Sequence, residues 1–207
     1  MGETSGTLAL CQKALERCRR GGSDLASALE ALERTLPSPL PSHGRRSDNL
    51  HLATKIRLNR EAITVLEEIC FGEPPASVLA VALPLLGRIS EQGEHHRLFL
   101  DRFGHLDPAV RAAAALGLAR LNTRVCLPPV QGPMLNLLRD PAAHVRASVV
   151  RALWLLDRTA ARSASSTPLT LILIASQDPD PEVRKAAADE IERYRNLGNP
   201  WARTHAP

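Results

Sequence analysis

Apolar side chains recur every three or four residues along the first third of the chain. This spacing predicts three helices, over Thr4–Arg20, Ser23–Leu36 and Asn49–Phe71, each with one apolar stripe. Ser23 and Asp24 are candidate N-caps of the second helix, because short polar side chains can accept the free N–H groups of a first turn. The stripes consist of Leu8, Cys11, Leu15 and Cys18, then Leu25, Leu29, Leu32 and Leu36, then Leu52, Ile56, Ile63, Leu66 and Ile69.

A segment without periodicity separates the second helix from the third. Residues 37–48 contain three prolines, three serines and one glycine, a composition typical of a linker. The sequence therefore predicts an N-terminal helical pair over 1–36, a Pro/Ser-rich linker over 37–48, and a repeat domain over 49–207.

An acid–proline pair followed by a valine recurs four times after residue 73. The valines are Val78, Val110, Val145 and Val183, which stand 32, 35 and 38 residues apart, and the element around Val110 is two residues shorter than the others. An Ala- or Leu-rich run follows each of the last three valines, over 112–121, 147–156 and 186–194. The recurrence indicates a chain built from similar structural units.

Each part of the repeated element has a structural reason. The carboxylate caps free N–H groups, proline fits the first helical turn, and the following valine and alanines allow close helix packing. Another helical piece precedes the last three elements, at His96–Leu106, Pro133–Leu138 and Pro168–Ser176. Two helices in a repeat of about three dozen residues are typical of an α-solenoid.

Over residues 73–196 the sequence resembles short HEAT/armadillo-type repeats with the pattern D-P-x-x-x-V-R-x-x-A-x-x-A-L. The first unit departs from the pattern, with Leu79 in the arginine slot and Pro84 inside the helix. The resemblance implies an all-α fold: a right-handed α-solenoid of helix pairs, with extra N-terminal helices. It also implies a structural ladder between neighbouring units, formed by Asp107, Asp140 and Asp178 with Arg111, Arg146 and Arg184. The last helix has a narrow apolar stripe and an otherwise polar surface, which predicts a polar C-terminal capping helix. Its polar positions are Lys185, Asp189, Glu190, Glu192, Arg193 and Arg195.

Composition agrees with helices and favours an intracellular protein, either cytoplasmic or nuclear. Aromatic residues make up only 3% of the chain, whereas β-sheets usually draw on aromatic and β-branched residues. The four cysteines form no C-x-x-C pair and no zinc-finger spacing, so we expect reduced thiols. No secretory signal and no apolar run long enough to span a membrane are visible.

Chemistry-bearing motifs are scarce, so we expect no enzymatic activity, metal or cofactor. Glu94, His95 and His96 form the only cluster that resembles metal ligands, but adjacent residues diverge by about 100° on a helix, which favours solvated helix-start residues. No nucleophile-elbow, phosphate-loop or dinucleotide-binding motif occurs.

We therefore expect a scaffold or adaptor subunit that holds another protein, as a peptide or helix, on the concave face of the repeat stack. The formal charge of +4 permits an acidic partner. The alternative is a nucleic-acid-binding protein similar to HEAT-like DNA glycosylases, in which Trp154 or Trp201 would stack on a base. The candidate partner-binding residues are the basic positions of the second helices: Arg111, Arg146, Arg151, Arg184 and Lys185.

Overall fold

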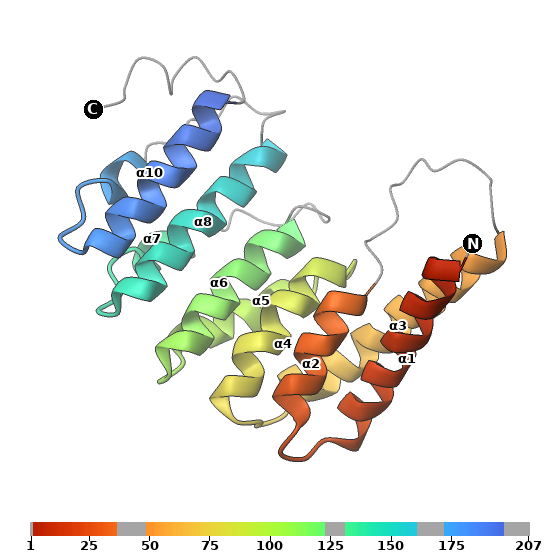
Figure 1. The fold of residues 1–207 in the computed structure, drawn as a ribbon. Coiled ribbons are helices and arrows are strands. Elements are labelled where there is room, and N and C mark those ends of the chain that lie inside the picture. Colours follow the sequence, from red (N-terminus) through yellow and green to blue (C-terminus); the bar gives the residue numbers. More distant parts are fainter. Residues whose placement is uncertain (1, 37–48, 123–130, 161–171, 197–207) are drawn as a thin grey trace.

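The computed structural model describes residues 2–36, 49–122, 131–160 and 172–196, and these segments contain helices and no strand (Figure 1). The predicted linker, Cys126 and Trp201 lie outside the described residues. The helices are α1 (Gly2–Arg20), α2 (Leu25–Thr35), α3 (Asn49–Phe71), α4 (Ala76–Ile89), α5 (His95–Asp101), α6 (Pro108–Asn122), α7 (Gln131–Leu137), α8 (Ala143–Ala160) and α10 (Pro181–Asn196), with a 3₁₀ turn at Arg102–Gly104. Residues 172–175, within the piece predicted before the last element, are also helical. The expectation of an all-α chain is confirmed for this part of the protein.

Helices α2, α4, α6, α8 and α10 lie side by side in chain order and form one layer, here called the second-helix layer (Figure 1). Each member contacts the next, while α3 packs against α4, α5 against α6, and α7 against α8. The N-terminal helices belong to the same stack, because α2 contacts α4 and α1 contacts both α2 and α3.

The four repeated valines occupy equivalent buried positions in α4, α6, α8 and α10, and the positions four, eight and eleven residues later are also buried in all four helices. Equivalent residues can therefore be compared directly between units. The three buried sets are Ala82, Ala114, Val149 and Ala187; Leu86, Leu118, Leu153 and Ile191; and Ile89, Leu121, Leu156 and Tyr194.

Side-chain capping occurs at three of the four acid–proline elements; the first, at Glu73, gives α4 no side-chain cap. In each of three units an aspartate Oδ1 accepts the backbone N–H two residues later, at 2.8–2.9 Å; the pairs are Asp107 with Ala109, Asp140 with Ala142, and Asp178 with Asp180. Asp24 does occupy the N-cap position of α2, but its side chain makes no cap bond and pairs instead with Arg17.

Some predicted boundaries differ from the structure. Helix α4 continues through Pro84, because eight of its fourteen residues are buried and their packing offsets the lost backbone hydrogen bond. The helical piece predicted over His96–Leu106 ends early in the 3₁₀ turn, and Leu106 is 96% exposed.

Glycines set the closest approach in the layer, between α4 and α6. A Cβ atom on Gly87 would lie 2.0 Å from the carbonyl oxygen of Gly117. A Cβ atom on Gly117 would lie 2.8 Å from the carbonyl oxygen of Leu83 and 2.4 Å from the Phe99 ring. Because backbone atoms cannot rotate away as a side chain can, the two helices approach this closely only with glycine at both positions.

We expect Gly87→Ala to lower the free energy of unfolding by about 1–3 kcal/mol or more, since the added methyl group overlaps backbone. Gly6→Ala is the matched control: Gly6 lies within α1 and is followed by Thr7, and no atom beyond its own helix lies within 4 Å of where its added Cβ would be. That variant should gain about 0.5–1 kcal/mol from helix propensity. Urea denaturation measures both, and equal stability of the two variants would contradict the close α4–α6 approach.

Candidate functional site

Arg111, near the start of α6, binds Asp140 of the next unit through two parallel hydrogen bonds from one edge of its guanidinium group. Arg111 Nε donates to Asp140 Oδ2 at 2.7 Å, and its Nη2 donates to Asp140 Oδ1 at 2.8 Å. The Arg111 side chain is 13% exposed and that of Asp140 is 4% exposed. This bidentate geometry combines charge with directional hydrogen bonds, so it fixes the register of adjacent units.

We call such a bidentate Arg–Asp pair a rung, and a second rung occurs one unit later. Arg146 Nε and Nη2 donate to the two carboxylate oxygens of Asp178, both at 2.8 Å, and the two side chains are 13% and 12% exposed. In both rungs the remaining Nη1 donates to the two carbonyl oxygens six and five residues earlier, His105 and Leu106 for Arg111 and Asp140 and Pro141 for Arg146. Each arginine therefore stabilises its own turn and the next unit at once.

The rungs lower the pKa of both carboxyl groups. For Asp178, the hydrogen bond from Arg146 has the largest effect and lowers the pKa. For Asp140, burial alone would raise the pKa, but hydrogen bonds from Arg111 and from the Ala142 N–H bring it below its ordinary value. Both aspartates are thus stabilised as carboxylates, which supports rungs that persist near neutral pH.

The structure separates the five candidate residues into two groups. Arg111 and Arg146 are engaged in rungs, so a partner could bind their guanidinium groups only by displacing an aspartate. Arg151, Arg184 and Lys185 are exposed. Arg184 retains the two carbonyl contacts of a rung arginine, to Asp178 and Pro179 at 2.8 and 2.7 Å, whereas Arg151 lies further along α8.

Three further arginines of the second helices, which were not among the predicted partner-binding residues, lie beyond the acid–proline motif, and Arg151 lies near them. Arg88, Arg120 and Arg193 each stand ten residues after the repeated valine of their own helix. Arg151 lies six residues after its valine, one turn from the equivalent position and therefore on the same helix face. We call Arg88, Arg120, Arg151 and Arg193 the arginine row. The signal was present as a periodic arginine, but it lies outside the acid–proline pattern that defined the repeat.

At one end of the arginine row, two guanidinium groups share one acidic residue of α2. Arg88 Nη2 donates to the carbonyl oxygen of Glu33 at 3.0 Å, and Arg120 Nη1 lies 3.9 Å from the Glu33 carboxylate. Arg120 Nη1 also donates to the carbonyl oxygen of Pro84 at 3.1 Å. Burial lowers the pKa of Arg120, an effect that Glu33 opposes and Arg88 reinforces. Positive charge therefore exceeds negative charge among these three side chains.

At the other end, an aromatic ring joins the row. The Arg193 guanidinium lies 5.2 Å from the Trp154 ring centroid, within the range of a cation–π contact. Arg193 also donates to both oxygens of Glu190, at 3.0 and 3.1 Å. The expectation that Glu190 lies on the polar surface of the last helix is wrong, because its side chain is 2% exposed, and burial raises its pKa.

A hollow of about 720 Å³ lies beside the start of α5 and the end of α3. His95 lies here and is buried: its Nε2 is 2.9 Å from Glu67 Oε1, and its Nδ1 is 2.6 Å from Ser90 Oγ. The expectation of a solvated His95 is therefore wrong. The order hydroxyl, imidazole and carboxylate is that of a nucleophilic triad, but Ser90 is fully buried, so a substrate cannot reach its hydroxyl.

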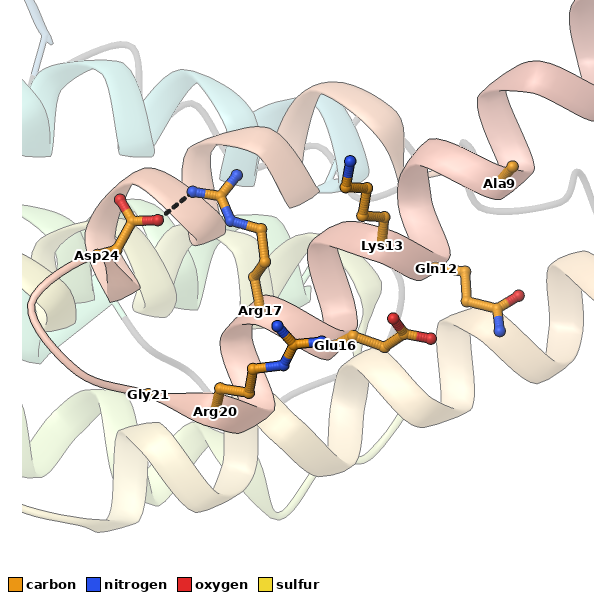
Figure 2. Close-up of a pocket in the computed structure, with 8 residues that line it drawn as sticks. All are labelled: Ala9, Gln12, Lys13, Glu16, Arg17, Arg20, Gly21 and Asp24. Atoms are coloured by element: carbon orange, nitrogen blue, oxygen red, sulfur yellow. Dashed lines mark hydrogen bonds and ion pairs between the residues drawn. The ribbon is translucent and has the colours of Figure 1, made fainter.

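A second hollow, of about 690 Å³, lies along α1 and the turn that leads to α2. Figure 2 shows Arg17 extended toward Asp24, with Lys13 and Arg20 on the same helix. Arg17 and Asp24 form an ion pair, and Glu16 adds another acid to the lining. The charges of this hollow are mixed and largely solvated, which does not define a ligand class.

The described residues offer no set of ligands for a metal ion, since no group of three or more His, Cys, Asp or Glu side chains converges there. Three thiols are free and buried, and burial raises the pKa of Cys11, that of Cys18 to about 11 and that of Cys70 to about 12. These thiols pack as core side chains. None of the described helices is long and apolar enough to span a membrane, as the sequence predicted.

Arg146→Ala should lower the free energy of unfolding by about 1–3 kcal/mol, because it leaves the Asp178 carboxylate partly buried without its cation. Arg184→Ala is the matched control at the equivalent position of α10, where the bidentate aspartate is missing in the part of the chain that the structure describes, so the loss should be smaller. Arg151→Ala should stay within about 0.5 kcal/mol. Equal losses at Arg146 and Arg184 would contradict a stabilising rung.

The rung should also depend on pH. A lowered pKa in the folded state contributes stability above the unfolded pKa of about 4, and this contribution is lost as pH falls through the folded pKa. Asp178→Asn should therefore be less stable than the parent at about pH 7, and the difference should shrink toward about pH 3. Urea unfolding at both pH values measures it, and a difference that grows on acidification would contradict the assigned direction.

Comparison with known proteins adds no assignment. No known protein-family model matches the chain, and no curated protein matches it either. The geometry of the arginine row and of the rungs is therefore the basis on which a function is proposed.

Proposed function

We propose that this protein is a non-enzymatic scaffold or adaptor that binds another protein on the exposed side of the second-helix layer. The observation that carries the proposal is the arginine row, which crosses α4, α6, α8 and α10 on one side of adjacent helices and has Trp154 beside Arg193 at one end. Arginine and tryptophan are the residues most enriched among strong contributors to protein–protein binding. The proposal includes the HEAT-like, right-handed solenoid predicted from the sequence, with this side as its concave face.

Charge favours an acidic peptide or helix as the partner. The arginine row carries four positive charges; Glu33 lies beside Arg120, and the buried Glu190 pairs with Arg193. Planar guanidinium groups bind carboxylates through two parallel hydrogen bonds, so a series of them fits acidic residues spaced along an extended or helical segment.

The rigidity of the second-helix layer supports binding on the surface that carries the arginine row. The two Arg–Asp rungs and the Gly87–Gly117 approach hold α4, α6, α8 and α10 in fixed register. A surface that is ordered before it binds loses less conformational entropy on association, so more of the contact energy contributes to affinity.

The nucleic-acid alternative draws on the same residues, because arginines bind phosphates and Trp154 could stack on a base. The contact between Arg193 and the Trp154 ring makes this less favourable, since a stacking base would have to displace the guanidinium group. Affinity for nucleic acid should therefore be weak and fall steeply between about 50 and 200 mM salt, as counterion release requires. Sub-micromolar binding at physiological salt, measured by fluorescence anisotropy, would overturn the preference for a protein partner.

Arg151→Glu should abolish partner capture, because it reverses charge in the middle of the arginine row. Arg60→Glu is the matched control: Arg60 is also an exposed arginine within a helix, but it lies on α3, outside the second-helix layer. Affinity capture from native extract with quantitative mass spectrometry compares the two variants with the parent. The proposal requires proteins that are lost with Arg151→Glu and retained with Arg60→Glu; equal recovery with both variants would contradict it.

A further inference from the structure

One side of α10 is uncovered where the other second helices are buried. Five residues after the repeated valine, α4, α6 and α8 carry the buried residues Leu83, Ala115 and Val150, whereas the equivalent Ala188 of α10 is exposed. Two residues after the valine, Ala112 and Ala147 are buried, but Lys185 is exposed. This side of α10 is the one that a following unit would cover.

Arg184 lies on this uncovered side and is held like the two rung arginines. Its Nη1 donates to the carbonyl oxygens six and five residues earlier, Asp178 at 2.8 Å and Pro179 at 2.7 Å. Arg111 and Arg146 make the equivalent pair of bonds. The guanidinium plane of Arg184 is therefore anchored before any carboxylate binds.

Within the described helices, the edge of the Arg184 guanidinium formed by Nε and Nη2 is not occupied in the way that it is in the two rungs. In Arg111 and Arg146, Nε and Nη2 bind an aspartate 29 or 32 residues further along the chain. No carboxylate among the described residues reaches this edge of Arg184, which is exposed. Residues 197–207, which directly follow α10, contain no aspartate or glutamate.

We infer that Arg184 is an open rung: a preformed binding position for an acidic side chain presented by a partner protein at the start of a helix. The two occupied rungs define this ligand, because in each the aspartate binds the arginine with both oxygens while one oxygen also accepts the N–H two residues later. The neighbouring Lys185 adds positive charge to the same side. The open rung is distinct from the arginine row, since Arg184 lies in the first turn of α10 and the row lies further along the helices.

Nuclear magnetic resonance of the arginine Nε–H groups tests the open rung within one molecule. The full chain, labelled with ¹⁵N, is titrated with a blocked Asp-Pro-Ala peptide, which supplies a carboxylate before proline as in the occupied rungs. The Nε–H resonance of Arg184 should move in a saturable manner toward those of Arg111 and Arg146, which already donate to carboxylates. Arg151, exposed but not anchored, should need a peptide concentration at least about fivefold higher, equivalent to roughly 1 kcal/mol.

Two controls make the result decisive. A blocked Asn-Pro-Ala peptide lacks the charge and should not move the Arg184 resonance. Arg184→Lys retains the positive charge but removes the planar pair of donors, so it assigns the resonance and should leave the other arginines unchanged. The inference is overturned if Arg184 and Arg151 respond alike, if the asparagine peptide acts as well as the aspartate peptide, or if Arg184 shows no saturable shift. Arg151→Glu should retain the Arg184 response, so this outcome is independent of partner binding on the arginine row.

Discussion

The bidentate bond between an arginine and the aspartate of the next unit is the interaction on which the rest of the stack depends. Each rung links three features: the aspartate caps its own turn, the arginine binds two carbonyl oxygens of the preceding turn, and the pair spans the junction between units. Because the two groups are more than four-fifths buried, the pair is less screened by salt than a surface ion pair. Register, capping and spacing are therefore set by one pair of side chains.

Small residues allow neighbouring helices to pack closely in the register that the Arg–Asp pairs set. Alanine and glycine line the contacts between α4, α6 and α8, and the Gly87–Gly117 approach leaves no room for a Cβ atom. Such close packing buries nearly all of α6, so its Arg111, Leu116 and Arg120 are among the few side chains that reach the surface. The scaffold thus restricts the chemistry that a partner can meet to a few positions per helix.

The sequence predicted the parts of the fold that depend on local periodicity and capping. Helix α3 has the predicted bounds, and the repeated aspartates Asp107, Asp140 and Asp178 accept the expected backbone N–H group. The burial of His95 and of Glu190 could not be predicted, because each depends on contacts that form only after packing, to Glu67 and Ser90 for His95 and to Arg193 for Glu190. The motif identified the arginines that hold the units together. The arginine row lies outside that motif, and its contacts with Glu33 and Trp154 depend on packing.

Trp154 gives the most direct test of the central claim, that a protein partner binds along the arginine row. The chain has two tryptophans, so Trp201→Phe leaves Trp154 as the only one. Emission from Trp154 is then recorded while a partner obtained by affinity capture is added, together with quenching by acrylamide. The account predicts a shift in emission and reduced quenching, because the partner covers the ring and the Arg193 group above it. Binding of the partner, verified independently, with unchanged Trp154 emission and quenching would contradict it.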